Sequence, residues 1–218
     1  MTVSQATNRV LGVERLAPGI FVLRFERKGL KFETGQYLSL GLPGLRKERE
    51  YSIYSGEADP ELSVLVKEVP SGEISPQLAK LKPGDALNVS GPFGYFLLRP
   101  TIGPGYPLLW IATGTGISPF RSFARSLPET DYVLLHGTRS LEETVLSSGF
   151  ARSQTVSCVS GSPGGTYHGR VTGYLSTMEL SPLTRVFLCG NCDMIYDAFD
   201  LLQAKGIPAG QIFTEVYY

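Results

Sequence analysis

Short apolar and alternating segments recur through the first hundred residues, and turn-forming residues separate them. Runs of this length with a two-residue period are typical of β-strands joined by short connections. Short connections favour antiparallel pairing, so the pattern predicts an antiparallel β-barrel with one helix at Ile74–Leu81, ahead of a Pro83–Gly84 turn. The expected strands are Ile20–Phe25, Tyr37–Leu42, Tyr51–Tyr54, Leu62–Val66 and Ala86–Val89.

After about residue 100 the chain alternates apolar runs, glycine turns and helical segments. This order predicts a doubly wound parallel α/β domain, in which ligands bind at the carboxyl ends of the strands. Proline and glycine are concentrated between Arg99 and Tyr106, so we expect one domain over residues 1–100 and a second over residues 101–218. The expected strands are Leu108–Ala112, Tyr132–Leu135, Thr155–Val159, Val186–Cys189 and Gln211–Val216, and the clearest helix is Asp193–Lys205.

The charge balance of the chain gives no indication of a strongly charged partner. Twenty basic and twenty acidic side chains leave no net charge, so neither a nucleic-acid partner nor an anionic membrane surface is indicated. The amino terminus lacks the basic and apolar regions of a secretion signal, and no segment has the ~20 apolar residues of a membrane helix. We therefore expect a cytoplasmic protein without membrane insertion, and the oligomeric state is left open.

Cysteine and histidine are sparse. Three cysteines, Cys158, Cys189 and Cys192, are too few for a four-cysteine iron–sulfur cluster. Neither His136 nor His168 has the spaced partners that a metal site requires. We expect no metal site.

Two segments of the first half combine residue types that suit a flavin dinucleotide. In Arg49-Glu50-Tyr51-Ser52, arginine can bind a pyrophosphate, tyrosine can stack on a flat ring, and serine offers a hydroxyl. Gly72-Glu73-Ile74-Ser75 stands at an expected helix start, where exposed N–H groups attract phosphate. Taken singly, the first also fits an ordinary amphipathic strand and the second a helix cap.

Two segments of the second half have the strand, glycine turn and helix order of a nucleotide-binding site. Thr113-Gly114-Thr115-Gly116 follows a buried strand, and glycine there lets the backbone approach a phosphate, although the full dinucleotide fingerprint is missing. Cys189-Gly190-Asn191-Cys192 repeats this order. An alternative for that segment is a dithiol redox pair, because two cysteines separated by two residues ahead of a helix are typical of thioredoxin-like proteins.

These motifs and their order resemble the ferredoxin–NADP reductase family, and the resemblance covers nearly the whole chain. The Phe32–Tyr37 segment is also similar to a family segment that precedes the flavin-binding strand. The resemblance implies an FAD-dependent enzyme that transfers electrons between NADPH and a one-electron carrier, ferredoxin or flavodoxin, with hydride passing to flavin N5. The cofactors it implies are FAD and NADP(H).

The resemblance also implies roles for individual residues. Arg49 would pair with the FAD pyrophosphate, Tyr51 would pack on the flavin, and Ser52 would bond near N5, while the backbone from Gly72 through Glu73 and Ile74 to Ser75 would cover the pyrophosphate. Tyr217 would stack on the isoalloxazine and Tyr218 against the adenine. On the coenzyme side, it implies a pyrophosphate turn made by Thr113, Gly114, Thr115 and Gly116, a nicotinamide site at Cys189, Gly190 and Asn191, and proton handling by Glu215.

The group of basic side chains that binds the 2′-phosphate of NADPH in the family is incomplete in this chain. Arg139 and Arg170 fit it, but Gly161 stands where related enzymes carry another arginine. No acidic residue occupies position 139, which favours NADPH over NADH. Two alternatives stay open: an NADH-using reductase component of an oxygenase, and a flavin electron-relay subunit of a larger complex.

Overall fold

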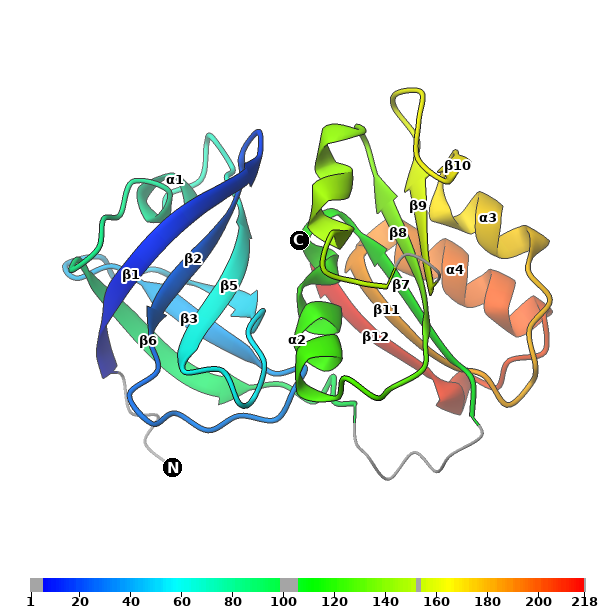
Figure 1. The fold of residues 1–218 in the computed structure, drawn as a ribbon, viewed down its shortest axis with the longest axis horizontal. Helices are drawn as coiled ribbons and strands as arrows, with labels where there is room; N and C mark the ends of the chain where they lie inside the picture. The colour runs from blue at the N-terminus through cyan, green and yellow to red at the C-terminus, as the bar shows by residue number, and fades with distance from the viewer. Residues whose placement is uncertain (1–5, 99–105, 152–153, 218) are drawn as a thin grey trace. The chain divides into compact units, whose positions relative to one another are not determined.

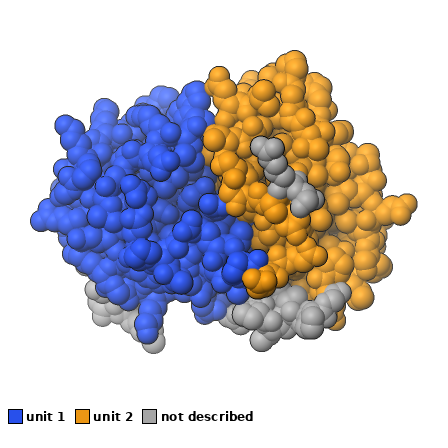
Figure 2. Space-filling view, in the orientation of Figure 1, with its two compact units in different colours: residues 1–98, 118–128 blue, residues 99–117, 129–218 orange. Residues whose placement is uncertain are grey.

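The computed structural model in Figure 1 describes residues 6–98, 106–151 and 154–217. Its internal contacts divide the chain into two compact units, which Figure 2 distinguishes by colour. Unit 1 consists of residues 1–98 and 118–128, and unit 2 consists of residues 99–117 and 129–218. A single boundary near residue 100 therefore does not describe this division, because one helix returns to the first unit.

Unit 1 is built on a six-stranded antiparallel sheet with the order β4-β3-β6-β1-β2-β5. Its two outer strands approach each other through an isolated bridge between Ile53 and Val64, so the sheet is barrel-like without a closed ladder. The alternating side chains that point inward form one apolar core. The strands are β1 (Ala6–Ala17), β2 (Ile20–Glu26), β3 (Tyr37–Gly41), β4 (Glu48–Ser52), β5 (Glu61–Lys67) and β6 (Ala86–Phe93).

Strand β1, the longest of the molecule, was missing from the sequence prediction. Two register irregularities, between Val10 and Gly12 and between Arg15 and Ala17, interrupt its pairing with β2. Such bulges shift the side chains between faces, so the two-residue period disappears from the sequence. The helix expected at Ile74–Leu81 is also shorter than predicted, since α1 spans only Ser75–Leu78.

Helix α2 (Ser118–Ser126) is the helix that returns to unit 1. Its two phenylalanines, Phe120 and Phe123, are fully buried and lie with their ring centroids 6.0 and 5.9 Å from that of Phe96. Two polar contacts add to this packing: Ser122 Oγ donates to the Ser55 carbonyl at 2.8 Å, and Arg125 holds both carboxylate oxygens of Asp59 at 2.8 Å.

Unit 2 contains a six-stranded parallel sheet with the order β10-β9-β8-β7-β11-β12. Strands are added on one side of β7 and then on the other, so the winding reverses between β7 and β11. In open sheets of this kind ligands bind where the winding reverses, at the carboxyl ends of the strands. The strands are β7 (Leu108–Thr113), β8 (Val133–Thr138), β9 (Thr155–Val159), β10 (Tyr167–His168), β11 (Arg185–Asn191) and β12 (Ile212–Tyr217).

Helices α3 (Val171–Thr177) and α4 (Cys192–Ala204) pack side by side over one face of this sheet (Figure 1). They share an apolar core with the strands, and Gly206, with φ +86°, ends the turn after α4. The short 3₁₀ helices η1 (Gly114–Ile117) and η2 (Glu142–Ser147) lie near the carboxyl ends of β7 and β8. The predicted fold class, an antiparallel barrel-like unit followed by a doubly wound parallel sheet, is confirmed.

Candidate functional site

Strand β4 carries the first of the predicted flavin-binding groups. Arg49 is exposed, and its Nη1 reaches only its neighbour, the Glu48 carbonyl, at 2.9 Å. Tyr51 is half-buried, and this burial raises the pKa of its hydroxyl to about 12, against the opposing effect of the Arg49 charge. Ser52 is buried at the end of the strand, opposite Tyr37. The strand thus presents an accessible cation beside a phenol that stays protonated.

The Gly72–Ser75 segment lies close to this strand. Lys47 donates to the Glu73 carboxylate at 2.6 Å, and the pKa of Glu73 is lowered by this bond and by the nearby charges of Lys47 and Arg49. Ser75 Oγ accepts from the Val69 backbone N–H at 2.9 Å, so its hydroxyl shapes the loop. In the described ranges the backbone N–H groups of Glu73 and Ile74 have no acceptor. Two cations beside free N–H groups fit the diphosphate of FAD.

In unit 2 the two predicted glycine turns meet where the winding reverses. An added Cβ at Gly116 would overlap the Cys189 carbonyl, and one at Gly190, where φ is +133°, would overlap the Thr113 side chain. The Asn191 backbone N–H donates to Thr113 Oγ1 at 3.0 Å, which ties the turns together. Only glycine permits this close approach.

Gly114 faces open space instead. Its φ is +52°, and a Cβ there would meet no heavy atom within 4 Å. The turn after β7 is therefore packed on the Gly116 side and accessible on the Gly114 side. That arrangement fits the phosphates of a dinucleotide, which need a firmly held backbone that they can approach closely.

Asn191 has a structural role. It is the N-cap of α4, and its Oδ1 accepts from the Met194 backbone N–H at 3.2 Å. This bond satisfies one of the free donors at the start of the helix. The side chain predicted to contact a coenzyme is thus occupied within the protein, and its backbone is held by Thr113.

Strands β11 and β12 bring three further predicted residues together. Cys189 pairs in register with Glu215, and its Sγ donates to Glu215 Oε2 at 3.8 Å. The thiol is fully buried, and burial together with the Glu215 carboxylate raises its pKa well above the ordinary value, although the Tyr217 hydroxyl acts in the opposite direction. Cys189 is therefore a neutral thiol at physiological pH, and it lies between a carboxylate and a phenol.

The alternative of a dithiol redox pair conflicts with this environment. Reactive dithiols depend on a thiolate whose pKa is lowered. Cys189 has the opposite perturbation, whereas Cys192 is partly exposed at the first residue of α4. Both thiols are free.

The basic residues expected at a 2′-phosphate follow two strands of the parallel sheet, β8 and β10, which are separated by β9. Arg139 follows β8 and Arg170 follows β10, and both side chains are exposed. Gly161 lies directly against Arg139, where a Cβ would come within 2.9 Å of Arg139 Cγ and closer still to its carbonyl. No larger residue fits at position 161 without a shift of that backbone.

His136 was considered in the sequence only as a metal ligand, and its actual contacts were missed. It is fully buried on β8, with Nε2 at 3.0 Å from the Gly114 carbonyl and Nδ1 at 3.2 Å from Ser147 Oγ. Burial lowers its pKa to about 4, although the bond to Gly114 acts in the opposite direction. A single histidine within an apolar strand was the only available signal for this support of the glycine turn.

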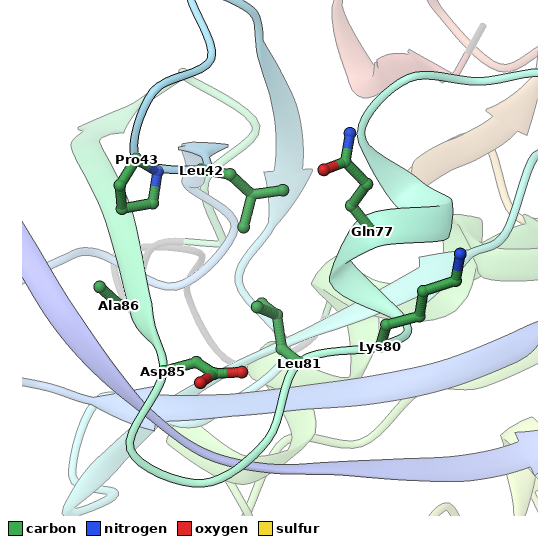
Figure 3. Close-up of a pocket in the computed structure, with 7 residues that line it drawn as sticks. All are labelled: Leu42, Pro43, Gln77, Lys80, Leu81, Asp85 and Ala86. Atoms are coloured by element: carbon green, nitrogen blue, oxygen red, sulfur yellow. The ribbon is translucent and has the colours of Figure 1, made fainter.

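An open pocket of about 640 Å³ lies elsewhere in unit 1 (Figure 3). Gln77 of α1 and Lys80 line one side of it, and Asp85 lies across from them. None of the predicted site residues belongs to its wall, so we do not assign the redox site to it. Leu42, Pro43, Leu81 and Ala86 complete the lining.

Residues 6–98, 106–151 and 154–217 contain no group of three metal-ligating side chains, and no helix in these ranges is long and apolar enough to cross a bilayer. Tyr218, predicted to contact the adenine, lies outside the described residues.

Comparison with known proteins relates the chain to FAD-binding oxidoreductases. Residues 15–97 match the oxidoreductase FAD-binding domain. The toluate 1,2-dioxygenase electron transfer component of Pseudomonas putida is 32% identical over 86% of this chain, which spans only 59% of that protein's length. A crystal structure of a ferredoxin NADP+ reductase from Neisseria gonorrhoeae, with bound FAD and NADP, has the same fold, with a TM-score of 0.87 at 22% identity and coverage of 98% of this chain and 99% of that one.

The flavodoxin/ferredoxin–NADP reductase of Shigella flexneri is 32% identical over 88% of this chain and 87% of its own length. The aligned part covers 88% of this chain, so it extends beyond the FAD-binding match at residues 15–97 into the parallel unit. The chain therefore belongs to the ferredoxin–NADP reductase family.

Proposed function

We propose that this protein is an FAD-dependent oxidoreductase that passes electrons between NADPH and a one-electron carrier, ferredoxin or flavodoxin. The observation that carries the proposal is the meeting of the Gly114 turn with the Cys189–Glu215 pair where the winding of unit 2 reverses. When bound, FAD exchanges a hydride with the nicotinamide and single electrons with the carrier.

In unit 1 the side chains bind and orient the flavin dinucleotide. Arg49 and the free N–H groups of Glu73 and Ile74 hold the diphosphate, and Lys47 keeps Glu73 away from it through their ion pair at 2.6 Å. Tyr51 packs on the flavin as a neutral phenol, and the Ser52 hydroxyl hydrogen-bonds the ring. These contacts exclude water and set the orientation of the ring.

In unit 2 the residues of the two turns bind the coenzyme. The open side of Gly114 receives its pyrophosphate, and Cys189 lines the nicotinamide site as a neutral thiol. Glu215 accepts the hydrogen bond from Cys189 Sγ, and it is the group that can hold a proton at this site. The stacking of Tyr217 on the flavin stays a prediction.

Arg139 and Arg170 support the choice of NADPH. Each is exposed after a strand that ends at the same edge of the sheet as the Gly114 turn. An arginine can bind a 2′-phosphate with two parallel bonds, whereas NADH offers it no partner. Glu143 Oε2 accepts from the Arg139 backbone N–H at 3.2 Å, so this carboxylate shapes the loop.

A second function, an NADH-using reductase component of an oxygenase, is favoured by one observation. Gly161 packs against Arg139 at a position that can carry no further cation. The 2′-phosphate would then rely on two arginines, and the discrimination between the coenzymes would be weak. The 32% identity to the toluate dioxygenase component agrees with this alternative.

Anaerobic reduction of the purified yellow protein distinguishes these functions. We expect bleaching of the flavin band by NADPH at concentrations at least about tenfold below those needed with NADH, followed by reoxidation by ferredoxin or flavodoxin. Equal responses to both coenzymes, with reoxidation only by an oxygenase component, would support the second function. If neither coenzyme bleaches the flavin, the protein is not a nicotinamide-dependent reductase.

A further inference from the structure

The buried imidazole of His136 connects two parts of unit 2 that are distant in the sequence. On one side its Nε2 lies 3.0 Å from the Gly114 carbonyl, in the turn after β7. On the other its Nδ1 lies 3.2 Å from Ser147 Oγ, in η2. His136 itself is fully buried on β8, between these segments.

The hydrogen bonds determine which nitrogen carries the proton. A carbonyl oxygen only accepts, so Nε2 must carry a proton and donate to Gly114. Burial holds the pKa of the ring at about 4, so the ring is neutral and its Nδ1 accepts. The Ser147 hydroxyl has one proton and two acceptors within reach, this Nδ1 at 3.2 Å and the Thr144 carbonyl, to which it donates at 3.0 Å.

The Gly114 carbonyl needs such a partner because of the conformation of its residue. Gly114 adopts φ +52° with open space on its outer side, so packing against that side does not hold it. Gly116, two residues later, is wedged against Cys189. The bond from His136 fixes the part of the turn that this wedge does not reach.

We propose that His136 is a positioning residue for coenzyme binding, which holds the Gly114 turn in the conformation that receives the pyrophosphate. This inference rests on the proposed function. The imidazole does not touch the coenzyme and acts through the Gly114 carbonyl. Ser147 Oγ lies 3.2 Å from the ring, and η2, to which Ser147 belongs, also contains Glu143, which accepts from the Arg139 backbone N–H. The same support therefore reaches from the pyrophosphate turn to the loop that carries Arg139.

Three substitutions separate the two hydrogen bonds. His136→Leu removes both of them. In His136→Gln the amide nitrogen can occupy the place of Nε2 and donate to Gly114, whereas in His136→Asn it reaches only the place of Nδ1, next to Ser147. Cys158→Ala is the matched control, because Cys158 is also fully buried, on the adjacent strand β9, where it pairs in register with Gly137 and is not a hydrogen-bond partner of His136.

The test measures binding of NADP+ to the FAD-loaded protein by titration calorimetry and hydrogen exchange of the peptide that spans Gly114–Ile117. We expect His136→Leu to weaken NADP+ binding about tenfold, the effect of losing one well-placed hydrogen bond, and to accelerate exchange in that peptide. His136→Gln should recover most of the parental affinity, His136→Asn should resemble the leucine variant, and Cys158→Ala should bind NADP+ as the parent does.

Two results would overturn the inference. The first is that His136→Leu binds NADP+ and exchanges as the parent does, or that Cys158→Ala loses as much NADP+ affinity as His136→Leu. The other is equal recovery by the asparagine and glutamine variants, which would mean that the Gly114 bond is not the one that matters. Should the leucine variant not fold, the contrast between glutamine and asparagine still decides. If the parent itself binds no NADP+, the proposed function fails, and that result is distinct from either of these.

Discussion

The three cysteines differ sharply in their surroundings, and this difference predicts their reactivity. Burial raises the pKa of Cys158 to about 12 and that of Cys189 well above its ordinary value, whereas Cys192 is partly exposed. Because the thiolate is the nucleophile, iodoacetamide at pH 7.5 should alkylate Cys192 and leave the other two unmodified. Peptide mass spectrometry of native protein measures this, with urea-unfolded protein as the control. A disulfide between Cys189 and Cys192 in oxidised protein would instead support the dithiol alternative.

Arg139 is the residue whose substitution should separate the two coenzymes. Arg139→Ala should raise the KM for NADPH roughly ten- to a hundredfold, since a bond to a charged group contributes about 1.5–3 kcal/mol, and it should leave NADH almost unaffected. Arg185→Ala is the matched control. Arg185 is a cation of the same unit at the amino end of β11, where it lies 5.1 Å from the centre of the Tyr106 ring. Equal effects of Arg139→Ala on both coenzymes would contradict the 2′-phosphate assignment.

His136 should also make stability depend on pH. Its pKa is about 4 in the folded protein, whereas an unfolded histidine has a pKa of about 6.5. Between these values the unfolded chain binds the extra proton, so the stability from His136 is present above pH 6.5 and is lost as the pH falls toward 4, by up to about 3 kcal/mol. Urea unfolding measured at several pH values should show that the free energy of unfolding falls more steeply with falling pH in the parent than in His136→Gln. An equal pH dependence in both proteins would mean that folding does not lower the pKa of His136.

At the scale of elements, helix α2 is held to unit 1 by a buried polar chain. Thr34 Oγ1 donates to Ser122 Oγ at 2.8 Å, and Ser122 Oγ donates to the Ser55 carbonyl at 2.8 Å. Ser122→Ala leaves both outer groups without this partner, and we expect a loss of about 1–3 kcal/mol in the free energy of unfolding. Ser126→Ala is the control, because Ser126 Oγ makes an exposed bond to the Glu57 N–H at 3.0 Å. Denaturant midpoints should therefore fall further for Ser122→Ala.

The elements also show which parts of the site were predictable. Both glycine turns were found in the sequence because a turn that follows a buried strand needs glycine locally, at Gly114 and Gly190. The tie between the turns, from the Asn191 N–H to Thr113 Oγ1, was not found, because its partners lie 78 residues apart. The proximity of Arg49 to the Gly72–Ser75 segment was not found for the same reason. It depends on folding contacts between distant residues, such as the bond from Lys47 to Glu73.

At the scale of the whole molecule, the two units should respond to different ligands. A ligand at a hundred times its dissociation constant stabilises the state that binds it by about 2.7 kcal/mol, so FAD should slow hydrogen exchange in residues 6–98 and 118–128. NADP+ should instead slow exchange in residues 106–117 and 129–217. Exchange measured with and without each ligand tests this division. Helix α2 gives the clearest test, because protection of α2 by NADP+ but not by FAD would mean that it belongs to the second unit.

The amino-acid sequence by itself determined the fold class and the positions of the two glycine turns, and it predicted which edge of the parallel sheet would bind the coenzyme. The hydrophobic period of a strand and the glycine of a turn are local properties, so a short segment of sequence is enough to reveal them. Where side-chain faces change within a strand, as at the bulges of β1, this local signal disappears.

The tertiary structure alone decided which unit holds α2, what supports Gly114, and why residue 161 is glycine. Each depends on groups brought together by packing: Phe96 beside Phe123, His136 beneath Gly114, and the Arg139 carbonyl against Gly161. A buried histidine in an apolar strand has the same sequence signature whether it binds a metal, fills the core or holds a turn. Its role follows from which polar atoms face it, because a buried polar group must be hydrogen-bonded and only the folded chain supplies the partner.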